Sequence, residues 1–137
     1  MRKYIYIGLG GFLGAAMRLL FREIRLFEWH DAIPLDTLLL NIAGAFVLAF
    51  ILTVSFEFRE LDADIRLGIS TGMIGAFTTF SALCKETVRL MNGGRYFYAA
   101  FYILLSAALG LGAVWLGTAA ARGLGKKWIA LKKRRMK

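Results

Sequence analysis

The stretch at residues 72–83, GMIGAFTTFSAL, lies in the middle of a long apolar segment and predicts a break in a membrane-spanning helix. A glycine in a helix interior costs about 1 kcal/mol relative to alanine, and the β-branched pair Thr78 and Thr79 favours extended backbone. In hydrocarbon, each peptide group that a break exposes costs several kcal/mol unless protein, water or an ion satisfies it. We therefore expect a break that is buried in protein and lines a site for something small and polar. The alternative is that the glycines only let helices approach and the hydroxyls bond their own helix.

The rest of the chain is equally apolar. Its 137 residues are 58% hydrophobic, with a mean hydropathy of +0.60, which is typical of a small integral membrane protein. Four apolar segments approach the roughly 20 residues that a bilayer requires, at residues 4–21, 36–56, 67–90 and 96–121. We predict an all-α membrane protein of four transmembrane helices with the third broken, forming one channel domain (1–125) and a basic tail (126–137). Nothing in the sequence pairs a nucleophile with a base or clusters metal ligands, so we do not expect an enzyme.

The net charge of +9 is concentrated at the end of the chain. Seven of the eighteen basic residues are Lys126, Lys127, Lys132, Lys133, Arg134, Arg135 and Lys137. We expect this tail to meet anionic lipid headgroups rather than nucleic acid, because no aromatic residues alternate with a basic face. Without the tail, the two sides of a four-helix topology carry five and six basic residues. That balance permits insertion in both orientations and an antiparallel dual-topology dimer, whereas the tail favours termini inside.

The interior offers hydrogen-bond donors rather than carboxylates. Glu86 is near the end of the third segment, and the apolar cores of the other three contain no acidic residue. The donors are Asn41, Thr78, Thr79, Ser81, Tyr102 and Ser106, accompanied by the rings of Phe77 and Phe80. Amide and hydroxyl hydrogens and positive ring edges suit a small anion stripped of water. The alternatives are that these groups only join helices and that Arg18 only reaches the headgroups instead of drawing anions into a vestibule.

Three motifs resemble the CrcB/Fluc family of fluoride channels: GAFTTFS at 75–81, GGFLGA at 10–15 with Arg18, and TLLLNIAG at 37–44. The resemblance implies an antiparallel, dual-topology dimer in a prokaryotic plasma membrane that exports fluoride passively through two narrow pores. It also implies a structural sodium ion held by the backbone carbonyls of Gly75 and Thr78. Pore positions of the family match Asn41, Phe80, Ser81, Tyr102 and Ser106, beside Thr79 from the donor set, and vestibule positions match Arg18 and Glu86.

Two positions depart from the pattern of the family. Leu83 stands where a second pore phenylalanine is usual, and Gly110 stands where a serine is usual. A homodimer and a heterodimer with a paralogue are therefore both open. Two other functions also compete: a small multidrug-type proton-coupled cation exporter that depends on Glu86, and a membrane scaffold that transports nothing.

Overall fold

The computed structural model describes residues 1–23, 33–58 and 61–135. The side chains of Arg22 and of residues 127–135 lie outside the described part, so the contacts of most of the basic tail do too. All the regular elements of the described ranges are helices: α1 (Arg2–Glu23), α2 (Leu35–Glu57), α3 (Ala63–Leu67), the π-helix η1 (Gly68–Ile74), α4 (Gly75–Phe77), α5 (Phe80–Asn92) and α6 (Tyr96–Arg135).

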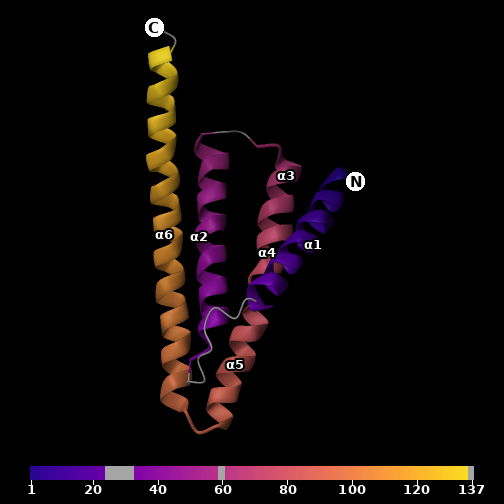
Figure 1. The fold of residues 1–137 in the computed structure, drawn as a ribbon, viewed down its shortest axis with the longest axis vertical. Helices are drawn as coiled ribbons and strands as arrows, with labels where there is room; N and C mark the ends of the chain where they lie inside the picture. Colours follow the sequence, from indigo (N-terminus) through magenta and orange to yellow (C-terminus); the bar gives the residue numbers. More distant parts are fainter. Residues whose placement is uncertain (24–32, 59–60, 136–137) are drawn as a thin grey trace.

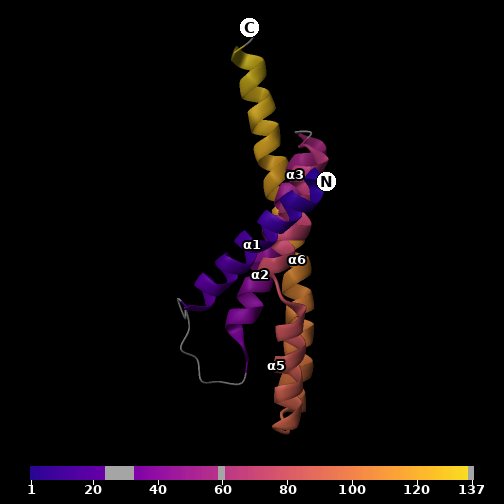
Figure 2. The same ribbon diagram turned by 90° about the vertical axis from the view of Figure 1, so that its right-hand side faces the viewer.

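Four of these helical stretches are long and apolar enough to cross a membrane, which confirms the predicted count. They are Arg2–Phe21, Leu35–Glu57, Ala63–Asn92 and Tyr96–Lys126. Figure 1 places both termini, the end of α2 and the start of α3 at one end of the molecule, and the α5–α6 hairpin at the other. The last helix continues past the fourth span as far as Arg135 and rises beyond the other helices (Figures 1 and 2). The division of the chain into a channel domain (1–125) and a basic tail (126–137) stays a prediction.

The third span is broken where the sequence predicts. Thr78 has φ −74° and ψ 159°, and Thr79 has φ −147° and ψ 112°, so two residues of extended backbone separate α4 from α5. The hydroxyl of Thr79 accepts a hydrogen bond from the amide of Ala82 at 3.2 Å and so caps the new helix. Threonine therefore both favours the extended backbone and restarts the helix after it.

Helix α1 packs closely against η1 through glycines. A Cβ atom added at Gly14 would come within 3.0 Å of the Met73 backbone, and one added at Gly72 would meet the Ile7 carbonyl oxygen at 2.5 Å. At Gly10, the added atom would lie within 3.0 Å of the backbone of both Gly68 and Met73. Only glycine permits backbones to approach this closely in a helix pair. The small residues of the first and third spans therefore hold the segment that leads into the break.

We expect Gly14→Ala to destabilise the protein by about 1–3 kcal/mol, because the methyl group overpacks a contact between two backbones. Gly8→Ala is the matched control, since a Cβ atom there meets nothing within 4 Å. Both changes raise helix propensity equally, so the difference between them isolates the clash. The measurement is the thermal or denaturant unfolding of each purified variant. Equal stability of the two variants would show that the α1–η1 contact is looser than described.

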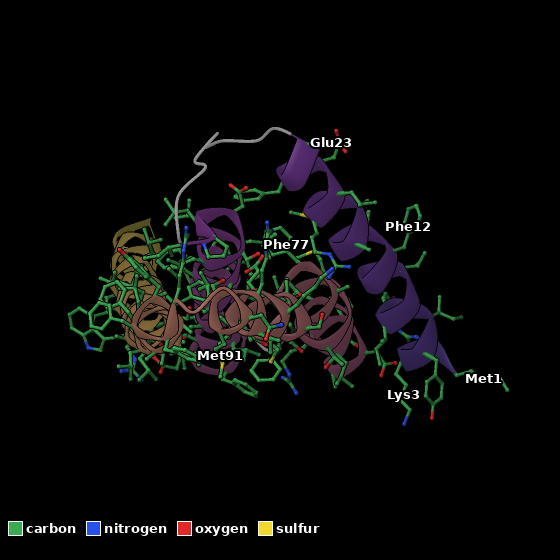
Figure 3. The ribbon with its side chains drawn as sticks, turned by 90° about the horizontal axis from the view of Figure 1, so that it is seen from below. Met1, Lys3, Phe12, Glu23, Phe77 and Met91 are labelled. Carbon is green, nitrogen blue, oxygen red and sulfur yellow. The ribbon has the colours of Figure 1, made fainter. Side chains whose placement is uncertain are left out.

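A single chain buries little of its apolar surface. Only 6% of the first span is buried, and the small core consists of Leu38, Leu90, Ala99 and Tyr102. Figure 3 shows Phe12 on the outer side of α1 and Phe77 on its inner side. Phe77 meets Phe21 edge to face, with ring centroids 6.3 Å apart. Most apolar side chains of the spans thus face outward from the chain.

Candidate functional site

The exposed peptide at the break is held by a side chain from another span. Asn41, on α2, accepts a hydrogen bond from the amide of Thr79 at 2.8 Å and donates one to the carbonyl oxygen of Thr79 at 3.0 Å. One side-chain amide thus satisfies both polar groups of the same residue, as a neighbouring strand would. A peptide freed in the membrane interior therefore has partners. Asn41 keeps one N–H for another acceptor.

This pairing also frees a carbonyl. In a continuous α-helix the amide of Thr79 would bond the carbonyl oxygen of Gly75, four residues earlier. Because the amide binds Asn41 instead, the Gly75 oxygen loses that donor. Gly75 is exposed in the single chain, and a Cβ atom there would touch only the Ser70 oxygen, at 3.9 Å. The break therefore removes the helical donor of a carbonyl group that belongs to an exposed residue.

An open cavity of about 320 Å³ adjoins the break. It is lined by Asn41, Gly44, Ala45, Leu48, Ile74, Thr78, Thr79 and Phe80. Gly44 lies directly opposite Thr78, since a Cβ atom at this glycine would collide with the methyl group of that threonine. The lining combines an amide, two hydroxyls and an aromatic ring with aliphatic walls. Such a site is suited to a small polar solute.

Glu86 is the centre of a second polar group. Its carboxylate accepts hydrogen bonds from the Thr37 hydroxyl at 2.7 Å and from the Tyr102 phenol at 2.7 Å. Tyr102 is 0% exposed. Thr37 and Asn41 are four residues apart and share a face of α2, so one helix face serves both Glu86 and the break. Sequence reasoning did not assign Thr37 to the site, although this spacing was available as a signal.

Several hydroxyl protons are already used inside the chain. Thr78 donates to the Ile74 oxygen at 2.9 Å, and Ser106 donates to the Tyr102 oxygen at 2.7 Å, both within their own helical segment. The hydroxyls of Thr79 and Ser81 share one hydrogen bond of 3.2 Å. Hydroxyl bonding back to the same helix, which the sequence left open, is therefore present at Thr78 and Ser106. A solute that uses these protons has to take them from an oxygen of the protein.

The predicted pathway residues form two groups in the single chain. Asn41, Thr79, Phe80 and Ser81 gather at the break, whereas Tyr102, Ser106 and Glu86 lie between α5 and α6. Phe80 is 76% exposed, although it also lines the cavity beside the break. Arg18, half-buried on α1, makes no hydrogen bond or ion pair with either group among the described residues. Leu83 packs against the small core and not toward the break.

Comparison with known proteins shows the family to which the sequence belongs. A family model described as CrcB-like protein, Camphor Resistance (CrcB), matches residues 5–118. A Bacillus anthracis protein named Fluoride-specific ion channel FluC 1 is 44% identical over 81% of this chain and 82% of its own length. A Moorella thermoacetica protein of the same name is 38% identical over 87% and 85%, and a Roseiflexus protein named Fluoride-specific ion channel FluC is 37% identical over 86% and 95%. These relatives are channels and not enzymes. The chain is thus a multi-pass membrane protein that belongs to the bacterial CrcB family.

Proposed function

We propose that the chain forms a passive, fluoride-selective channel that lets fluoride leave the cytoplasm and so relieves its toxicity. The observation that carries the proposal is the broken third span, whose Thr79 peptide is held by Asn41 beside a largely apolar cavity that Asn41, Thr78 and Thr79 also line. The relatives named as fluoride-specific channels support the same ion. The pathway uses Asn41, Thr79, Phe80 and Ser81 at the break, and Tyr102 and Ser106 further along. Arg18 and Glu86 are assigned to the vestibules.

We propose further that two chains associate in antiparallel orientation. The support is the small buried fraction of each span and the exposure of Phe80, whose ring has little to pack against in its own chain. A partner would enclose the cavity and bring its own donors to the ring. Because Leu83 is used in the core, each chain supplies one ring at the break. A homodimer of this chain and a heterodimer with a paralogue both satisfy this arrangement.

A structural sodium ion at the centre of the dimer fits the same break. The oxygen of Gly75 has lost its helical donor, and Thr78 has the extended backbone of the break. Carbonyl oxygens suit a hard monovalent cation. The carbonyl groups of Gly75 and Thr78 from two chains would hold the ion, and its charge would favour an anion nearby.

The deciding experiment is fluoride against chloride efflux from proteoliposomes that contain the purified chain, alone and with a paralogue of opposite orientation. We expect fluoride efflux without a proton gradient and no comparable chloride efflux. Efflux by the chain alone supports a homodimer, and efflux only with the paralogue supports a heterodimer. An absence of fluoride efflux in both preparations would overturn the proposal. Proton-driven export of quaternary ammonium compounds would instead support the exporter.

A further inference from the structure

The end of the molecule opposite both termini carries a concentrated positive charge. Lys85 and Arg89 lie on α5 and Arg95 lies in the turn that follows, and all three residues are exposed. Lys85 and Arg89 are one helical turn apart and therefore share a face. From residue 87 to the end of the chain the sequence contains no acidic residue. Three cationic side chains thus lie at or before the hairpin. The last acidic residue of the chain is Glu86, which lies between the first two of them.

The neighbouring carboxylate, that of Glu86, is hydrogen-bonded toward the bundle and forms no ion pair with these cations among the described residues. Glu86 accepts its two hydrogen bonds from Thr37 and Tyr102, which lie on other helices of the bundle. The two ion pairs among the described residues are at the opposite end, where Arg2 meets Asp62 at 3.9 Å and Arg122 meets Glu57 at 2.6 Å. Within the described ranges, two cations at the terminal end, Arg2 and Arg122, therefore have carboxylate partners, whereas Lys85, Arg89 and Arg95 form no ion pair.

We place the hairpin at the level of the lipid headgroups, because it joins the third and fourth candidate membrane spans. The third span ends at Asn92 and the fourth begins at Tyr96, and Figure 1 shows the hairpin as the extremity of the molecule on that side. Exposed aromatic residues follow at once, with Tyr96 65% and Phe97 78% exposed, as is usual at a membrane interface. The Phe97 ring stacks on Phe101 at 6.4 Å between centroids, and Leu104 continues the exposed strip.

We propose that this hairpin binds the phosphate headgroup of an anionic phospholipid. Lys85, Arg89 and Arg95 supply the positive charge, and the strip from Phe97 to Leu104 lies beside an acyl chain. Charge complementarity selects an anionic lipid over a zwitterionic one, and the apolar strip selects a lipid over free phosphate. The proposal does not depend on which ion the protein conducts.

The test is native mass spectrometry of the purified, full-length protein with equal amounts of phosphatidylglycerol and phosphatidylcholine. We expect preferential retention of phosphatidylglycerol, and we expect the variant Lys85→Gln/Arg89→Gln/Arg95→Gln to lower this preference at least about tenfold. The matched control Arg2→Gln/Lys3→Gln/Arg122→Gln removes the same charge at the opposite end and should change the preference much less.

Three results would overturn the proposal: no preference in the unmodified protein, equal effects of the two triple variants, or loss of the bound lipid on addition of excess inorganic phosphate. The last result would indicate a site for free phosphate. If the triple variant does not fold, Lys85→Gln and Arg95→Gln are tested singly. Each should then lower the preference in part, and an unchanged preference in both would also contradict the proposal.

Discussion

Asn41→Asp should lower fluoride efflux from proteoliposomes at least about tenfold, which corresponds to a barrier raised by about 1.4 kcal/mol or more. An aspartate can still accept from the Thr79 amide, but it has no hydrogen to donate to the Thr79 oxygen, now bonded at 3.0 Å. A buried carbonyl that loses its donor costs about 1–3 kcal/mol, and a carboxylate places negative charge beside the proposed anion path. Both effects act at the break itself.

The matched control for this prediction is Asn92→Asp, the same chemical change at the exposed end of α5. It should leave efflux unchanged. Size-exclusion profiles and unfolding curves of both variants separate a lost pathway from a lost fold. A well-folded Asn41→Asp protein with normal efflux would remove Asn41 from the pathway and would show that the break tolerates an unsatisfied peptide.

Phe80→Ile should abolish most fluoride efflux while the fold survives. The ring is 76% exposed in its own chain, so the substitution removes little packing within that chain. What it removes is a polarised ring edge, which attracts an anion and which a branched aliphatic side chain lacks. We expect a decrease of at least about tenfold in the initial efflux rate recorded with a fluoride electrode, with no change in thermal unfolding.

Phe12→Ile provides the comparison, because Phe12 is 72% exposed on the outer side of α1 and lies far from the break. It should conduct like the unmodified protein. If Phe80→Ile and Phe12→Ile lose the same fraction of fluoride efflux, the loss results from general contacts of exposed rings with lipid or with a partner chain, and not from the pathway. If neither variant loses efflux, Phe80 is not part of the path.

Sequence reasoning located the break because its cause is local. Two glycines weaken the helix that leads into the break, and the β-branched pair Thr78 and Thr79 becomes extended. A polar Asn41 in an apolar run requires a partner. The sequence could not identify the partner of Asn41, because Asn41 and Thr79 are 38 residues apart and meet only when α2 packs beside the third span. The same limit applies to Glu86, whose two donors come from α2 and α6.

The π-helix η1 was not predicted, because no residue type specifies i→i+5 hydrogen bonding. Its neighbourhood offers a physical reason: Gly10 lies against both Gly68 and Met73, so the shape of the segment depends on backbone contact with α1.

From the sequence, Leu83 was interpreted only as the absence of a second phenylalanine ring. In the structure it is a packing residue of the small core, which gives the aliphatic side chain a purpose of its own.

On the proposed pathway, the bonding of the Ser106 hydroxyl within its own helix has a consequence for discrimination between halides, and Thr78 beside the break is bonded in the same way. A permeating ion does not enter a row of waiting donors, because each of these protons already belongs to a peptide oxygen. It must win the proton in an exchange, and only an anion that is a stronger acceptor than an amide oxygen gains by doing so. Fluoride is a stronger hydrogen-bond acceptor than chloride, so under this proposal we expect competition with the backbone to favour fluoride even where the width of the pathway would let both ions pass.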